Sequence, residues 1–288
     1  MQNRFITSLM LIKQSMAIIR QRLSLLIFPC VSTILILVCI ALISMPLVEK
    51  ETIALKTNYI SGMNYFIFLA AVLFLFALIN MISLLFNAAL TTCALKHMKH
   101  ESYTVMDGFK AAFARLGKLF LWKIFMDTAG IIIRFLEYWM DSWPTFYIAK
   151  HILQNVKLRI AIFFVTPILM TEKLSLLSTV KRSAYLIKNN WGASQQYNVN
   201  IGIILFALNI ISLLPALVAF LMGGKIIIII GSTISTILLL SMSIIHSASH
   251  DILGAGLYLY ANGVEMSEFY DTQLLRNAFE VVKKVHDN

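Results

Sequence analysis

Charged residues are scarce in this sequence. Asp, Glu, Lys and Arg together make up 13% of its 288 residues, whereas about a quarter is usual in a soluble domain. Residues 23–48, 57–95, 189–224 and 226–249 contain none of these four residue types. Each run exceeds the ~20 residues needed to cross a hydrocarbon core about 30 Å thick. The sequence therefore predicts an all-α, polytopic membrane protein and argues against an ordinary soluble domain.

Common catalytic and redox motifs are also absent. The chain has no GxSxG motif, Walker loop or dinucleotide-binding fingerprint, so soluble-type hydrolase, nucleotidase and dehydrogenase functions have no support. Its three cysteines, Cys30, Cys39 and Cys93, lie in apolar stretches and form no CxxC pair. We therefore expect them to be small buried side chains and predict no cofactor.

The charge that is present is mostly positive and lies on alternate connections between the apolar runs. The formal net charge is +10, and no basic run is interleaved with aromatics, so we expect membrane lipids as partners and no nucleic acid. The segments before the first, third and fifth predicted spans carry four, five and four basic residues. By the positive-inside rule, we predict six transmembrane helices in a bacterial or archaeal cytoplasmic (inner) membrane, with both termini cytoplasmic.

Each basic segment has the spacing of an amphipathic helix. Residues 1–22 place Leu9, Ile12, Met16 and Ile19 on one side, and residues 174–191 form a second such helix. The apolar stripe of that second helix is Leu177, Val180, Ala184, Ile187 and Trp191. The middle helix lies within 107–118, with Asp107 as its expected cap. We predict that these helices lie on the cytoplasmic surface and contact anionic headgroups through Lys13, Arg20, Arg22, Lys181, Arg182 and Lys188.

A short internal repeat supports this layout. Ser8–Lys13 matches Ser183–Lys188 at serine, leucine, isoleucine and lysine, and each copy precedes a predicted membrane hairpin. We infer three helix-hairpin units, about 1–95, 104–170 and 174–260. Together they form one membrane domain, 1–260, followed by a polar cytoplasmic tail, 261–288.

Four stretches carry a family resemblance: Leu26–Pro29, Phe163–Lys173, Lys181–Gly192 and Gly256–Gly263. Together they resemble the prokaryotic integral-membrane family called domain of unknown function 6159, over about residues 3–265. That family looks distantly similar to the membrane domain found beside glycerophosphodiester phosphodiesterases. The resemblance implies a six-helix membrane fold and supplies no reaction.

Ionisable residues at membrane depth are candidates for function because they are costly to place there. The third and fourth apolar segments depart from the family pattern by carrying such residues, which could form a polar seam for a small solute, an ion or a lipid headgroup. The alternative is a hairpin whose charges neutralise one another. The seam residues are Lys123, Asp127, Arg134, Glu137, Lys150, Lys157 and Arg159.

Two histidine pairs form a second candidate site. His97 and His100 follow the second span, and His246 and His250 lie one turn apart near the end of the sixth, with Asp251 adjacent. Imidazole and carboxylate groups suit zinc or another divalent ion, although no HExxH motif is present.

These observations leave three function classes open. The chain could be a non-enzymatic protein that handles lipid or passes a small solute. It could instead be a structural or regulatory subunit of a membrane complex that docks through the tail 261–288. A protein partner or a homo-oligomer is possible. A metal-dependent intramembrane enzyme is the third class.

Overall fold

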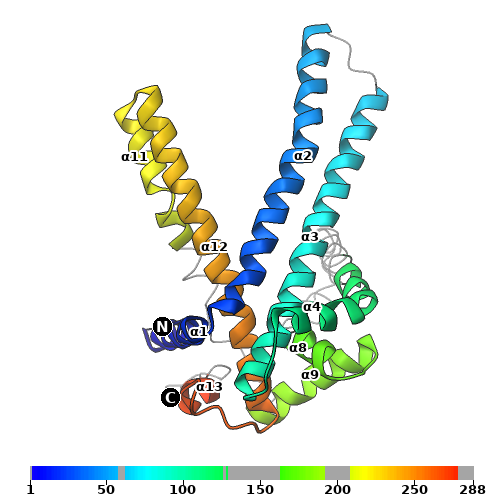
Figure 1. The fold of residues 1–288 in the computed structure, drawn as a ribbon, viewed down its shortest axis with the longest axis vertical. Helices are drawn as coiled ribbons and strands as arrows, with labels where there is room; N and C mark the ends of the chain where they lie inside the picture. The colour runs from blue at the N-terminus through cyan, green and yellow to red at the C-terminus, as the bar shows by residue number, and fades with distance from the viewer. Residues whose placement is uncertain (1, 58–61, 126–127, 129–162, 192–207, 278–288) are drawn as a thin grey trace, which may run out of the picture.

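In the computed structural model, which describes residues 2–57, 62–125, 128, 163–191 and 208–277, every regular element is a helix. Two helical arms diverge from a common base, so the described chain has the outline of a V (Figure 1). The first arm is formed by α2 (Ile27–Thr57) with α3 (Gly62–Met98). The second is formed by α11 (Leu214–Met222) with α12 (Lys225–Ala261).

The base consists of short elements packed around the C-terminal parts of α3 and α12 (Figure 1). It contains α1, the 3-10 helix η1, α4, α8, α9 and α13. Their bounds are Gln2–Gln21, Leu23–Leu26, Val105–Ala114, Val165–Thr171, Leu176–Trp191 and Thr272–Asn277.

The helices α3 and α12 each have 37 residues, which corresponds to about 55 Å at 1.5 Å per residue. Because a hydrocarbon core is about 30 Å thick, each is long enough to cross it and continue into the base. Three described segments are long and apolar enough to span a membrane: Leu23–Leu42, Leu69–Met98 and Lys225–Ala261. Leu208–Met222 is a shorter apolar helix. The third and fourth predicted spans lie largely outside the described residues.

The second arm is held together by close backbone approach. Gly231 of α12 faces α11 so closely that an added Cβ would lie 2.3 Å from the Ala219 Cβ and 2.7 Å from the Pro215 carbonyl oxygen. The amide N–H of Ala216 donates to Ser235 Oγ at 2.8 Å. Ala216 lies in the first turn of α11, where backbone amides lack a partner within the helix. Ser235 therefore satisfies one of these amides.

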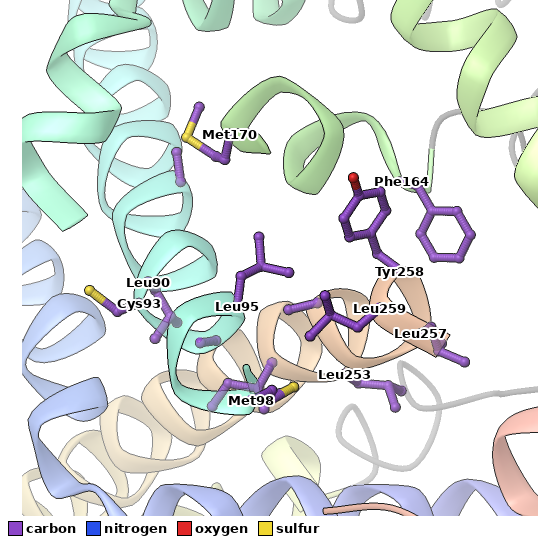
Figure 2. Close-up of a cluster of buried hydrophobic side chains, with 14 of the residues drawn as sticks. Leu90, Cys93, Leu95, Met98, Phe164, Met170, Leu253, Leu257, Tyr258 and Leu259 are labelled. Atoms are coloured by element: carbon purple, nitrogen blue, oxygen red, sulfur yellow. The ribbon is translucent and has the colours of Figure 1, made fainter. Parts of the chain in front are cut away.

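The base contains the hydrophobic core. Buried side chains converge there from α3 (Leu90, Met98), α8 (Phe164, just before it) and α12 (Leu253, Leu257), as Figure 2 shows. The upper parts of the arms instead expose large apolar side chains. The protein core and the apolar arm surfaces are therefore separate regions.

The helix α4 docks on α3 through a glycine. An added Cβ at Gly108 would lie 2.7 Å from Cys93 Sγ and 2.8 Å from the Ala89 carbonyl oxygen. Thr104 is the N-cap residue of α4, and Asp107 closes a capping box by accepting the Thr104 N–H at 2.8 Å. The prediction that Asp107 itself caps the helix was therefore wrong by one turn. The hydrogen bonds from Thr104 hold the pKa of Asp107 below its ordinary value.

The amphipathic helices α1 and α9 form where predicted, and part of each expected stripe is packed, since Ile12, Ile19 and Ile187 are buried. In α1 the buried residues include Leu11, Ser15 and Ile18, while Leu9 is 48% exposed. In α9, Leu177 is 73% exposed, and the buried residues are Thr179, Ser183, Leu186 and Ile187. The expected stripes were incomplete because buried hydroxyl groups contribute to the packed faces. Ser183 Oγ, for example, accepts the Phe164 N–H at 3.2 Å.

Candidate functional site

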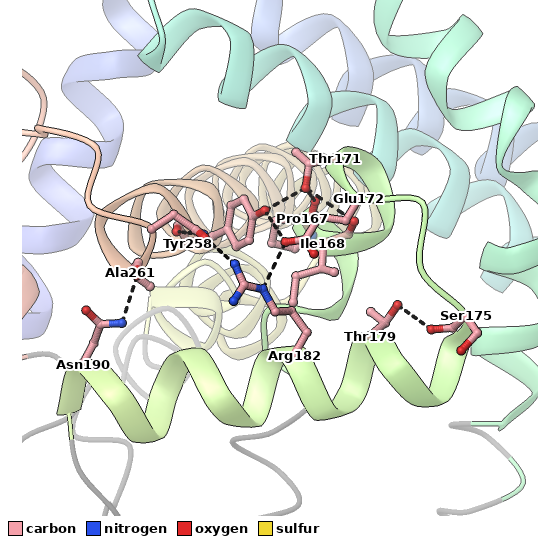
Figure 3. A network of polar contacts seen from close by, with 11 residues as sticks. Pro167, Ile168, Thr171, Glu172, Ser175, Thr179, Arg182, Asn190, Tyr258 and Ala261 are labelled. Carbon is pink, nitrogen blue, oxygen red and sulfur yellow. Dashed lines mark hydrogen bonds and ion pairs between the residues drawn. The ribbon is translucent and has the colours of Figure 1, made fainter.

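A polar network joins α8, α9 and α12 in the base (Figure 3). The Tyr258 hydroxyl on α12 shares a 2.8 Å hydrogen bond with Thr171 Oγ1 and donates to Glu172 Oε1 at 3.1 Å. Arg182 of α9 contacts the same Glu172 oxygen at 3.4 Å and donates to Asn262 Oδ1 at 3.0 Å. One carboxylate thus links three helices.

The position of Glu172 explains why it needs these partners. It is the C-cap residue of α8, where a carboxylate is disfavoured by the partial negative charge of the helix terminus. Arg182 and Tyr258 offset that cost. Arg115 and Lys118 act similarly, donating to the carbonyl oxygens of Met170 and Leu174 near the same terminus. The network therefore fixes the orientation of α9 against α12.

The predicted headgroup contacts divide into two groups. Lys13, Arg20 and Arg22 are exposed at α1 and the turn after it, and Lys181 and Lys188 are exposed on α9. Arg182 is different, because it is partly buried and engaged by Glu172 and Asn262. Its guanidinium carbon also lies 5.9 Å from the centre of the Tyr185 ring. Arg182 therefore stabilises contacts between base helices, whereas the five exposed residues remain available to headgroups.

The base helices α1, α4 and α9 each have a second apolar surface besides the one packed into the core. On each of them, exposed large hydrophobic side chains lie next to an exposed lysine. We call these the three mixed faces. They are formed by Ile6, Leu9, Met10 and Lys13 on α1, by Met106, Lys110 and Phe113 on α4, and by Leu177, Lys181, Tyr185 and Lys188 on α9.

Of the predicted polar seam, only Lys123 lies within the described residues, and it is half-buried. Asp127, Arg134, Glu137, Lys150, Lys157 and Arg159 lie outside them, so the seam stays a prediction.

The predicted metal residues occupy two places in the base. His100 Nε2 lies 3.2 Å from Glu268 Oε2, and the His97 ring packs against Tyr103 and Phe269. His250 Nδ1 lies 3.6 Å from Asp251 Oδ1, with His246 one turn earlier on α12. Within the described ranges, no group of three or more His, Cys, Asp or Glu residues could hold a metal ion. The metal hypothesis therefore gains no support from this geometry.

Sequence reasoning missed the network around Glu172 and Tyr258. Its only local indication was a carboxylate directly after an apolar helix, where an unpaired acid is unfavourable. Tyr258 could not be found from spacing, because it lies 86 residues from Glu172. Arg182 lies only 10 residues from Glu172, but it was assigned to lipid headgroups instead.

The described part of the chain is all-helical, and three of its helices are long and apolar enough to span a bilayer. A protein-family model described as "Family of unknown function (DUF6159)" matches residues 67–267. The match covers more than half of the chain, and the protein belongs to this family. Comparisons with curated proteins and with solved structures gave no match. The similarity to the membrane domain beside glycerophosphodiester phosphodiesterases stays a prediction.

Proposed function

We propose that the chain is a non-enzymatic, multi-pass protein of the cytoplasmic (inner) membrane that binds and organises anionic lipid at its base. The observation that carries this proposal is the set of mixed faces on α1, α4 and α9. An apolar side chain beside an exposed lysine suits the boundary between acyl chains and headgroups, because the lysine stem lies along apolar surface while its ammonium reaches the phosphates.

The position of these faces supports a lipid partner. They belong to the base, from which both apolar arms extend (Figure 1), so a membrane containing the arms brings its headgroup layer close to the base. Each basic residue near an anionic surface contributes about 1 kcal/mol of attraction. Five of the six predicted headgroup residues are exposed, and together they provide a substantial preference for anionic over zwitterionic lipid.

The described helices nearest the two chain ends support one shared side for both termini. The helices α1 and α13, near the two ends, contact each other in the base. Together with the positive-inside distribution of charge, this supports the proposal that both termini are cytoplasmic. Accessibility of tags at residues 1 and 288 in sealed vesicles tests this topology, and tags on opposite sides would overturn it.

The lipid proposal is tested with the full chain reconstituted into mixed bilayers. Spin-labelled phosphatidylglycerol and phosphatidylcholine report the relative association of each lipid with the protein. A variant with Lys13→Gln, Arg20→Gln, Lys181→Gln and Lys188→Gln should lose most of the preference for phosphatidylglycerol. An unchanged preference would overturn the proposal.

A matched single substitution controls for loss of charge alone. Lys181 lies on α9 in the base, whereas Lys225 begins α12 at the far end of the second arm. We expect Lys181→Gln to weaken the preference for phosphatidylglycerol, measured with spin-labelled lipid in the headgroup layer beside the base. Lys225→Gln should leave that signal unchanged.

A further inference from the structure

The described residues after α12, 262–277, run across the base to α13 (Figure 1). We define Val264–Leu275 as the C-terminal strap. Its Tyr270 hydroxyl shares a 2.8 Å hydrogen bond with Ser15 Oγ of α1. The Leu275 carbonyl accepts Trp191 Nε1–H of α9 at 3.1 Å, and Glu268 lies 3.2 Å from His100, just beyond α3. The strap therefore touches parts of the chain far apart in sequence.

Tyr270 is the largest fully buried side chain of the strap. Tyr270 is 1% exposed and is among the largest fully buried side chains of the described chain. Its ring fills the space left by Gly256 on α12, where an added Cβ would lie 2.6 Å from Tyr270 Cε2. Burial raises the pKa of the Tyr270 hydroxyl well above its ordinary value, so this hydroxyl stays protonated and can keep its bond to Ser15.

The remaining strap contacts are of two kinds. Met266, Phe269 and Leu275 are also buried in the core of the base, whereas one ion pair is exposed. The His100 and Glu268 side chains are about two-thirds exposed, and an exposed ion pair contributes little to stability. The helix α13 at the end of the strap has only six residues. The buried side chains, rather than this ion pair, therefore hold the strap on the base.

We propose that the C-terminal strap is a clasp that holds α1 and α9 in one fixed arrangement, with Tyr270 seated in the space beside Gly256. This inference rests on the proposed function for its consequence, since α1 and α9 carry two of the three mixed faces. The clasp presents these faces to the headgroup layer as one rigid surface. Displacing Tyr270 from the space beside Gly256 would leave α1 free to move relative to α9.

Two glycines on one helix provide a matched test. Gly256→Ala places a methyl group against the Tyr270 ring, whereas Gly254→Ala meets nothing within 4 Å. Hydrogen exchange of the reconstituted full chain measures the result. In Gly256→Ala we expect amides of α1 and of the strap to exchange roughly tenfold faster or more. The α2 amides in the first arm should stay at the wild-type rate. Gly254→Ala should match the wild type throughout.

A milder variant covers the outcome in which Gly256→Ala fails to fold. Tyr270→Phe keeps the ring but removes the hydroxyl that bonds Ser15, and we expect a smaller increase in exchange confined to α1 and the strap. Wild-type exchange of α1 in Tyr270→Phe, or in a folded Gly256→Ala protein whose strap is released, would overturn the clasp.

Measuring lipid preference on the same samples separates this proposal from the proposed function. Faster α1 exchange in Gly256→Ala, with no phosphatidylglycerol preference in the wild type, would uphold the clasp and overturn lipid binding. A clear phosphatidylglycerol preference in the wild type, with α1 hydrogen exchange unchanged in both variants, would uphold lipid binding and overturn the clasp.

Discussion

The base and the arms of this protein use the same residue types in opposite ways. In the base, leucine and phenylalanine side chains such as Leu90 and Phe164 are fully buried and are accompanied by hydroxyl and carboxylate groups that have defined partners. In the arms, Leu221 and Phe220 are more than 70% exposed. Apolar composition therefore serves two purposes here: it forms a protein core in the base and provides the surface that meets lipid in the arms.

The sharpest test of this comparison is one substitution made in both regions. Leu90→Ala removes a side chain that is 0% exposed and leaves a cavity in the base, so we expect a loss of about 3 kcal/mol of unfolding free energy. Leu221→Ala, at a position 76% exposed near the tip of the second arm, should change it by no more than about 0.5 kcal/mol. Thermal unfolding in one detergent measures both. Equal losses would mean that the arm tip is packed against protein.

Overpacking at a helix contact gives the next largest effect. Gly108→Ala forces a methyl group against Cys93 Sγ and the Ala89 carbonyl oxygen, and we expect a loss of about 2 kcal/mol. Gly117→Ala is the control, since nothing lies within 4 Å of its added Cβ. Thermal midpoints should fall only for Gly108→Ala. If both variants unfold like the wild type, α4 is not docked tightly on α3.

The smallest expected effect is the pH dependence of the α4 cap. The pKa of Asp107 is lower in the folded protein than its ordinary value of 3.8, so its carboxylate stabilises the folded state above that value. This contribution is lost as the pH falls from about 3.8 through the lowered folded pKa. Asp107→Asn should remove this part of the pH dependence of the thermal midpoint while keeping the neutral-pH fold. An identical acid profile in both proteins would contradict the capping role.

The sequence was a good guide to properties that are local along the chain. The helices α1 and α9 form within the predicted ranges, and three of the uncharged runs supply helices long and apolar enough to span a membrane. It was a poorer guide to which side of each base helix is buried. Ser15 and Ser183 were not expected on packed faces. Ser15 bonds Tyr270, which is 255 residues away, and Ser183 accepts the N–H of Phe164, which is 19 residues away.

The same limit applied to the charged residues. Arg182 and Lys181 are adjacent, and both were predicted to reach headgroups. The structure engages Arg182 with Glu172 and Asn262 while Lys181 remains exposed. Residues 261–288 were predicted to form a polar cytoplasmic tail. That prediction gave no reason to expect that Tyr270 and Leu275 are buried in the base.

By itself, the sequence determined that this protein is helical and has segments suited to a membrane, because the length of an uncharged apolar run and its periodicity are written in consecutive residues. Only the tertiary structure decided which hydroxyl groups are buried, which cation is paired and where Tyr270 and Leu275 lie. Each of these depends on a partner brought close by folding, and for the Ser15–Tyr270 pair that partner is 255 residues away.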